Sequence, residues 1–248
     1  MLSKDEAVCL RAVDYSETSQ IVTLFARSAG KISAIAKGSK RPRSAFDGPI
    51  EILSHGHIVI TDGDKDRLAT LTEFQQEPGF AALRGNLFAM NCCLFAAELV
   101  NNLTHDYDAH PELYDSLLQF LRDVNGQQAD NARREIMALL VLFQLTVLRE
   151  VGLQPVLHCC ANCKAGFNSG WRGAYFSSSA NGLICGDCEG AFAEKVRLTW
   201  KTADCLANLK TVGTADETTL FGVEKLLVRH FTEILHRPPR MATQVLRG

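Results

Sequence analysis

The sequence predicts an α+β protein of two domains, an N-terminal β-barrel followed by a helical domain with an inserted four-cysteine zinc ribbon. Short β-branched segments separated by turn residues fill residues 4–75. From about Pro78 the hydrophobic residues instead recur with the period of a helix. Two Cys-x-x-Cys pairs then interrupt the helical part. We therefore expect a barrel domain at 1–77 and a helical domain at 78–248, a division that suits a chain of 248 residues.

Five segments of the first domain have the composition and alternation of strands. Residues 31–37 alternate with period two, and residues 21–26 are rich in β-branched and aromatic side chains. A turn containing Gly30 separates these two segments. Five short strands in so short a domain indicate a small closed barrel, for which the OB-fold is the leading candidate. The expected strands are residues 7–13, 21–26, 31–37, 50–61 and 68–74.

The second domain is expected to be built from helices of ordinary length. The central one is apolar on nearly all sides between Ile136 and Leu148, so we place it in the middle of this domain. Gly152 ends it, and Pro238-Pro239 ends the last helix. The basic tail beyond these prolines is expected to be loose. The expected helices are residues 78–103 with an interruption near Gly85, 111–124, 131–151, 203–212 and 219–235.

The two Cys-x-x-Cys pairs predict a zinc ribbon at about residues 156–193. Each pair places two thiolates about one turn apart, so that one tetrahedral ion can take both pairs. Cys159 is a neighbouring thiol, but Cys160 alone has the two-residue spacing to the next cysteine. Because four cysteines close the coordination shell, one structural Zn²⁺ is expected. The expected ligands are Cys160, Cys163, Cys185 and Cys188.

One catalytic alternative is a zinc deaminase, whose signature joins H-x-E to a later P-C-x-x-C. His110-Pro111-Glu112 matches the first half, but residue 159 is cysteine where the second half needs proline. The same three residues fit a helix start, with proline in the first turn and an acid near the helix N-terminus. The sequence contains no glycine-rich phosphate-binding motif. We therefore expect a protein that is not an enzyme.

The clearest candidate for ligand binding is a basic segment between Lys31 and Arg43. The whole chain has a net charge of −2 and a pI of about 6.4, so any nucleic-acid site must be a local patch. The segment has no acidic residue. Its cations suit a phosphate backbone, whose counterions they release, and the alternative is a solvated loop that binds nothing. The cations of this segment, which are candidates for contact with phosphates, are Lys31, Lys37, Lys40, Arg41 and Arg43.

Two aromatic residues near this segment allow two interpretations. Phe25 and Phe46 are either base-stacking residues in an OB-fold groove or members of the barrel core. The core is the commoner place for phenylalanine.

Cysteine usage indicates a reducing compartment. The chain has nine cysteines, an odd number, and four of them are assigned to the zinc ribbon. The sequence shows no signal peptide, and no apolar run approaches the roughly 20 residues that span a bilayer. We therefore expect a cytoplasmic protein.

Several stretches of the sequence are distinctive in combination. They are VCLRAVDYSET at 8–18, IVTLF at 21–25, GKISAIAKG at 30–38, the basic loop ending at Arg43-Ser44, and EVGLQPVL at 150–157 leading into Cys160. Together they resemble the RecO family of bacterial recombination-mediator proteins over nearly the full chain. The resemblance implies an N-terminal OB-fold, a helical domain and a zinc ribbon inserted in that domain, in agreement with the patterns above.

The resemblance also implies a function. RecO-like proteins are not enzymes: they bind single- and double-stranded DNA, anneal complementary strands and, with RecR, assist loading of RecA onto DNA coated by single-strand-binding protein. It further implies that the five cations contact DNA, that the four cysteines hold zinc, and that the protein is associated with the nucleoid. Two rival functions are a zinc-ribbon adaptor between proteins without direct DNA binding and an RNA-binding OB-fold protein of translation.

Overall fold

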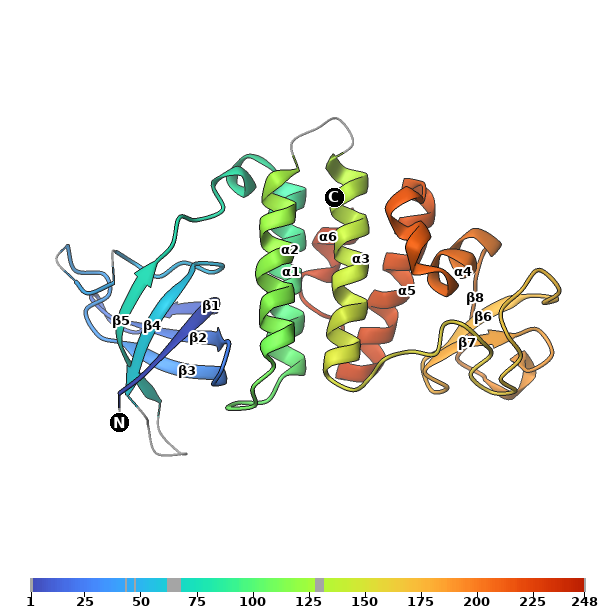
Figure 1. Cartoon of the computed structure of the whole chain (residues 1–248), viewed down its shortest axis with the longest axis horizontal. Coiled ribbons are helices and arrows are strands. Elements are labelled where there is room, and N and C mark those ends of the chain that lie inside the picture. The colour runs from blue at the N-terminus through green and yellow to red at the C-terminus, as the bar shows by residue number, and fades with distance from the viewer. Residues whose placement is uncertain (1, 43, 47, 62–67, 128–131, 248) are drawn as a thin grey trace. The chain divides into compact units, whose positions relative to one another are not determined.

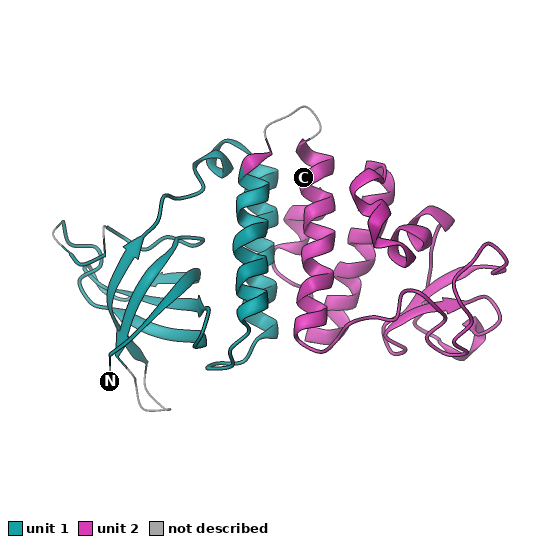
Figure 2. Cartoon of the chain, viewed as in Figure 1, with its two compact units in different colours: residues 1–125 teal, residues 126–248 magenta. Residues whose placement is uncertain are grey.

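A computed structural model describes residues 2–42, 44–46, 48–61, 68–127 and 132–247. The chain forms two compact units, residues 1–125 and 126–248 (Figure 2). The barrel strands and the two helices that follow them make up unit 1. No helix within the described ranges is both long and apolar enough to cross a membrane.

The barrel strands are β1 (Leu2–Asp14), β2 (Gln20–Ala26), β3 (Gly30–Ala36), β4 (His55–Thr61) and β5 (Ala69–Gln76). They close in the order β1-β2-β3-β5-β4 (Figure 1). The first half of β1 pairs with β4 and its second half with β2, and a bulge between Cys9 and Arg11 bends this long strand. β3 and β5 are parallel, which completes the closure. The predicted OB-fold barrel is therefore confirmed.

Alternate residues of the strands fill the barrel interior. On β3 the residues at 32, 34 and 36 are buried while their neighbours are partly exposed, as a half-buried strand requires. Phe46 belongs to this core and is 3% exposed. Phe25 is fully buried on the other side of β2, with its ring 6.3 Å from that of Tyr114. Both phenylalanines are thus interior residues, and neither is available to stack on a base.

Two helices complete unit 1, namely α1 (Leu87–Leu103) and α2 (Pro111–Gly126), and a 3-10 helix at Ala81–Gly85 precedes them. The predicted helical segment at 78–103 is interrupted after Gly85 as expected, but it begins at Ala81 and not at Pro78. The Asn86 side chain accepts a hydrogen bond from a backbone N–H of the first turn (3.0 Å), which fixes the beginning of α1.

The connection between α1 and α2 lies directly against the start of β3. The Tyr107 N–H donates to the Lys31 carbonyl oxygen (2.9 Å). A Cβ atom on Gly30 would come within 2.1 Å of the Asp108 carbonyl oxygen, and Gly30 also has a φ of +72°. Only glycine meets both conditions. These contacts explain why α1 and α2 belong to the same compact unit as the barrel.

Unit 2 consists of α3 (Ala132–Glu150), β6 (Ala174–Ser177), β7 (Gly182–Cys185), β8 (Val196–Arg197), α4 (Trp200–Ala207), α5 (Glu217–Leu235) and α6 (Ala242–Arg247), with 3-10 helices at Glu189–Ala191 and Leu209–Thr214. α3 packs against α5, and the three strands form one small sheet in the order β7-β6-β8. The helices around α3, together with the inserted sheet, confirm the predicted class of the second part of the chain.

Two expectations for unit 2 are wrong in detail. The predicted helix at 203–212 starts earlier, because Thr199 caps α4 by accepting a hydrogen bond from the Thr202 N–H (3.1 Å). It also ends earlier and gives way to a 3-10 helix. The basic tail is not loose, since Ala242 and Val245 of α6 are buried and α6 packs against α5.

Candidate nucleic-acid interface and metal centre

The cationic loop, residues 37–41, follows β3 and is fixed at its base by hydrogen bonds to the turn between β1 and β2. The Gly38 N–H donates to Ser19 Oγ (3.1 Å), and the Lys40 N–H donates to the Thr18 carbonyl oxygen (3.1 Å). Gly38 has a φ of +75°, which a glycine adopts without strain. The loop and the turn therefore form one hydrogen-bonded piece of structure.

The buried side chain of Gln20 makes a second set of hydrogen bonds beneath this loop. Its Oε1 accepts hydrogen bonds from Ser39 Oγ (3.0 Å) and from the Ile50 N–H (2.9 Å), and its Nε2 donates to the Ile50 carbonyl oxygen (3.1 Å). Ser39 is itself fully buried. Each such bond contributes about 1 kcal/mol net, and leaving one group unpaired would cost more. The base of the cationic loop is thus held in one conformation while its charged side chains reach solvent.

The structure brings three of the predicted DNA contacts together on this loop. Lys37 and Arg41 are exposed. Lys40 is partly exposed, and its Nζ lies 2.8 Å from the Asp14 carboxylate. An ion pair with an exposed carboxylate is worth no more than about 1 kcal/mol, so a phosphate can replace it. Arg43 lies outside the described residues.

Lys31 is placed differently from the other predicted contacts. Its Nζ donates hydrogen bonds to the carbonyl oxygens of Asn101 (2.9 Å) and Thr104 (2.6 Å), and it lies 3.4 Å from the Asp106 carboxylate. Its side chain is only 14% exposed. A cation at the C-terminal end of α1 is stabilised by the carbonyl groups there. Lys31 therefore fastens α1 to the barrel, and we leave it out of the candidate interface.

Two residues on the exposed side of β1 and its turn escaped the sequence analysis, Arg11 and Tyr15. Ala12 packs toward the barrel core, so Arg11 and Val13 on either side of it point outward. The alternation of inward and outward side chains from Arg11 to Tyr15 could have indicated this surface. It was overlooked because acidic Asp14 and the turn residues interrupt the basic character of this stretch.

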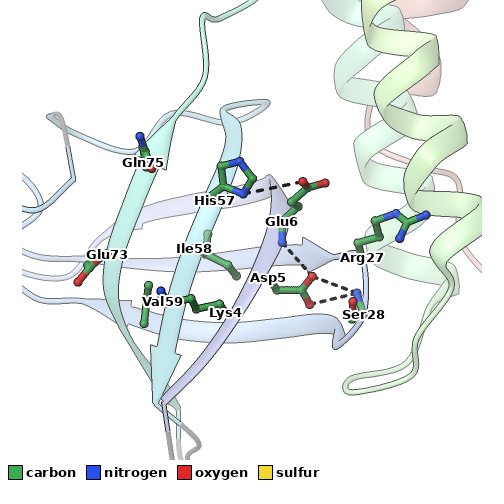
Figure 3. A pocket seen from close by; sticks show the side chains of 10 residues that line it. All are labelled: Lys4, Asp5, Glu6, Arg27, Ser28, His57, Ile58, Val59, Glu73 and Gln75. Atoms are coloured by element: carbon green, nitrogen blue, oxygen red, sulfur yellow. Dashed lines mark hydrogen bonds and ion pairs between the residues drawn. The ribbon is translucent and has the colours of Figure 1, made fainter.

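The barrel also has a mixed-charge hollow over β1, β4 and β5, which Figure 3 shows from close by. Three carboxylates line it, those of Asp5, Glu6 and Glu73. Asp5 serves the fold by accepting hydrogen bonds from backbone N–H groups between β2 and β3 (2.9 to 3.2 Å). The Arg27 guanidinium is bonded to Asp115 (2.8 Å). Because acids outnumber lysine and arginine here, this hollow disfavours phosphate.

In unit 2 the structure gathers the four predicted ligand cysteines into one cluster. Their Sγ atoms all lie within 4.8 Å of one another, and those of Cys163 and Cys185 are 3.8 Å apart. A tetrahedral ion with Zn–S distances of about 2.3 Å would separate its sulfur ligands by about 3.8 Å. Cys159 is outside the cluster, and its backbone forms an isolated antiparallel β-bridge with Gly166. The donor set and its spacing therefore fit one metal ion. The cluster is Cys160, Cys163, Cys185 and Cys188.

Tight turns hold the two cysteine pairs in position. The Lys164 N–H donates to the Cys160 carbonyl oxygen (2.9 Å), with Lys164 at a φ of +64°. The second pair begins at the last residue of β7, Cys185, whose carbonyl oxygen accepts a hydrogen bond from the Cys188 N–H (3.1 Å). The Cys185 N–H also donates to Cys160 Sγ (3.4 Å). The backbone is therefore folded around the sulfur atoms from both sides.

The surroundings affect the two buried thiols in opposite ways. Burial opposes ionisation of Cys160, but the backbone N–H groups of Cys185, Cys163 and Asn162 outweigh it and lower the pKa of this thiol to about 7. Burial raises the pKa of Cys185 to about 12. A divalent cation would reverse that burial effect, because it binds the thiolate form. Four sulfur ligands leave no open coordination position, so an ion here would be structural.

The H-x-E segment lies elsewhere in the fold. Pro111 is the first residue of α2 and Glu112 lies in its first turn, as a helix start predicts. The His110 ring nitrogen Nε2 lies 3.2 Å from the Asp108 carboxylate and is not part of the four-cysteine cluster. The deaminase alternative has no support in this arrangement.

The two parts of the chain, the barrel with its cationic loop and the helices with their four-cysteine ribbon, each match a sequence model of a recombination protein. The sequence model described as "Recombination protein O N terminal" matches residues 1–77. The model described as "Recombination protein O C terminal" matches residues 84–235. The chain belongs to the RecO family.

Curated relatives agree with this assignment. The DNA repair protein RecO of Anaeromyxobacter dehalogenans is 34% identical, over 84% of this chain and 79% of its own length. That of Rhodopirellula baltica is 32% identical, over 82% of this chain and 73% of its own length. The RecO protein of Alkaliphilus metalliredigens is 31% identical, over 83% of this chain and 81% of its own length.

Proposed function

We propose that this protein is a non-catalytic recombination mediator that binds single- and double-stranded DNA and anneals complementary strands. The cationic loop carries the proposal, because Lys37, Lys40 and Arg41 gather on a segment that the barrel holds rigidly. The mixed-charge hollow on the same barrel supports it by contrast, since its acids would repel the same ligand. Membership of the RecO family makes DNA the expected polyanion.

Annealing by such a surface needs no active-site base. Two DNA strands repel each other, and lysine and arginine side chains lower that repulsion by replacing bound counterions. A loop that is already ordered loses little conformational entropy when it binds phosphate. Base pairing in the DNA then supplies the free energy of annealing. The protein contributes local charge and position.

We extend the proposal to the partners that family membership suggests. The protein would act with RecR, on DNA coated by single-strand-binding protein, and assist the loading of RecA. Its place of action would be the nucleoid.

We also propose that the four-cysteine cluster holds one structural Zn²⁺. Four soft sulfur donors in a tetrahedral arrangement favour zinc over oxygen-seeking cations such as Mg²⁺. The ion would join the two cysteine turns and supply the ribbon with stability that its small apolar core cannot. Metal analysis of the purified protein should find one zinc per chain. Finding none in protein purified without chelator would contradict the assignment.

The annealing proposal is tested with two complementary oligonucleotides, one carrying a fluorophore and the other a quencher. The full chain should accelerate quenching at low salt. The triple variant Lys37→Ala, Lys40→Ala, Arg41→Ala should lose this acceleration and keep its far-ultraviolet circular dichroism spectrum. A charge-matched control removes three other cations of unit 1, through Lys4→Ala, Arg84→Ala and Arg122→Ala. This control should anneal like the native chain.

The same assay separates the rival functions. A native chain that neither binds DNA nor accelerates annealing at low salt would sink the proposal and favour an adaptor between proteins. A marked preference for RNA over DNA of the same sequence would indicate recognition of the 2′-OH, and with it the RNA-binding alternative.

A further inference from the structure

The turn between β1 and β2 presents an aromatic side chain beside the cationic loop. Within this turn the Tyr15 N–H donates to the Ser19 carbonyl oxygen (3.0 Å), and the Ser19 N–H donates to Ser16 Oγ (3.1 Å). Within the described ranges, the Tyr15 side chain makes no hydrogen bond, ion pair or ring contact, and the residue is 64% exposed. The turn is therefore ordered by its own bonds and does not use the tyrosine ring to hold itself together.

Strand register places the ends of β1 and β3, after which Tyr15 and Lys37 follow, at the same end of the barrel. Val13, Ile21 and Ile35 pair across β1, β2 and β3 and so lie in one row. Tyr15 is the first residue after β1 and Lys37 the first after β3, so both lie just beyond the same end of this row. The hydrogen bonds between the turn and the cationic loop hold these two chain segments side by side.

The charges around Tyr15 favour a polyanion. Asp14 precedes Tyr15 in the chain and pairs with Lys40 (2.8 Å), so these two residues together add no net charge. Glu17 is exposed on the same turn and opposes binding. Against it stand Lys37 and Arg41 on the cationic loop and Arg11 on the outer face of β1. An exposed aromatic ring with cations around it is the arrangement that binds single strands, because phosphates meet the cations while an unpaired base stacks on the ring.

We propose that Tyr15 is the stacking platform for an unpaired base of a single DNA strand whose phosphates the cationic loop holds. The inference rests on the proposed function and specifies the form of DNA that this face of the barrel binds best. A base in a duplex is already stacked on its neighbours, so the tyrosine ring offers it nothing further. Tyr15 therefore gives the barrel a preference for single strands, which the cations alone would not supply.

The test compares Tyr15→Ala and Tyr15→Phe in the full chain, using fluorescence anisotropy with labelled oligo(dT) and with a labelled duplex of equal length. Removing a stacking ring should weaken single-strand binding about 5- to 140-fold. Tyr15→Phe keeps the ring and should bind within about twofold of the native chain. Duplex affinity should change by less than about twofold in both variants. Tyr107→Ala is the matched control, since Tyr107 is also an exposed tyrosine of unit 1 but lies by the start of β3.

The salt dependence distinguishes stacking from damage to the cationic loop. Tyr15→Ala should leave the slope of log K against log salt unchanged, because stacking releases no counterions, whereas Lys37→Ala should reduce it by about 0.7. Equal losses on single strands and duplex, or a reduced slope in Tyr15→Ala, would overturn the inference. Unchanged single-strand affinity in Tyr15→Ala would also overturn the inference. In that case the proposed function would still stand if the variant lacking Lys37, Lys40 and Arg41 fails to anneal DNA. A native chain that binds no DNA would overturn both.

Discussion

The barrel of unit 1 and the ribbon of unit 2 are stabilised by different means. The barrel of unit 1 has a continuous apolar core to which all of its strands contribute, including Leu24, Ile32 and Phe74. In the ribbon of unit 2, the buried residues at the centre are Cys160, Ile184 and Cys185. Two of these three are thiols. The barrel can therefore be stable through apolar burial alone, while the ribbon needs a metal ion to replace the core that it lacks.

The helical part of unit 2 also contains a buried group that responds to solution conditions. Glu224 of α5 is completely buried, and its Oε2 accepts a hydrogen bond from Gln144 Nε2 of α3 (2.7 Å). Its Oε1 has no partner among the described residues. Burial raises the pKa of Glu224 to about 7. The stability of unit 1 should thus depend mainly on its apolar core, and that of unit 2 also on metal and pH.

Metal removal should produce the largest difference between the units. Structural zinc sites contribute on the order of 10–16 kcal/mol of binding free energy at neutral pH. Both tryptophans of the chain are reporters for the ribbon, because the rings of Trp171 and Trp200 lie 5.2 and 5.0 Å from that of Phe167. A strong chelator should shift their emission to longer wavelength and lower the melting temperature.

Single-strand affinity measured at low salt should survive the same treatment, because the cationic loop is built on the barrel. Cys160→Ser should reproduce the effect of the chelator, and Cys159→Ser should not. Unchanged emission and melting after complete metal removal would show that the ribbon is stable without an ion.

Truncation of the barrel core should give the next largest effect. Phe74 is fully buried, so Phe74→Ala should cost unit 1 about 3–5 kcal/mol in chemical unfolding. The zinc content should stay at one per chain. Leu68→Ala is the control, since Leu68 is 45% exposed just before β5. A loss of zinc in Phe74→Ala at denaturant-free conditions would mean that the two units do not keep separate sources of stability.

Glu224 should make a distinct contribution to the pH dependence of unit 2. Its pKa is about 7 in the folded protein against about 4.5 for a free glutamate, so the folded state holds the extra proton. That contribution to stability is complete below about pH 4.5 and is lost as the pH rises to about 7, a change of up to about 3 kcal/mol. Burial lowers the pKa of His230, also on α5, to about 4, so its effect on stability runs in the opposite direction between about pH 4 and 6.5. The Glu224 effect is therefore measured as the difference between the native chain and Glu224→Gln in urea unfolding from pH 5 to 8. An identical pH profile in the variant would refute the assignment.

Lys31 offers a smaller and more specific test within unit 1. Lys31→Met keeps most of the apolar stem but leaves two carbonyl oxygens of α1 without their charged donor, which should cost about 1.5–3 kcal/mol of stability. DNA affinity at low salt should stay within about twofold of the native value. If Lys31→Met kept native stability but lost much of its DNA affinity, Lys31 would be a DNA contact after all.

Local patterns were sufficient for much of the fold. The period-two segments predicted the barrel strands, and the cysteine spacing alone selected Cys160 over Cys159 as a ligand, in agreement with the cluster in the structure. Both signals are carried by residues close together in the sequence. Element ends were less accurate, because caps such as Asn86 and Thr199 decide them through single hydrogen bonds. The helix α6 was missed because it is short and is stabilised by packing on α5.

The candidate interface was only partly predictable for the same physical reason. Lys31 and Lys37 look alike in a basic segment, yet Lys31 is drawn to the carbonyl oxygens of Asn101 and Thr104, about 70 residues later in the chain. Tyr15 became visible only once the register put its turn beside the cationic loop. Contacts between distant segments decide which cations are free, and the sequence pattern does not contain them.

The most direct test of the central claim is the salt dependence of single-strand binding by the full chain. The slope of log K against log salt falls by about 0.7 for each phosphate contact removed from a single strand. The variant lacking Lys37, Lys40 and Arg41 should therefore lose about two from the native slope. The charge-matched control lacking Lys4, Arg84 and Arg122 should keep the native slope. Equal slopes for the two variants would contradict the claim that the cationic loop is the DNA-binding surface.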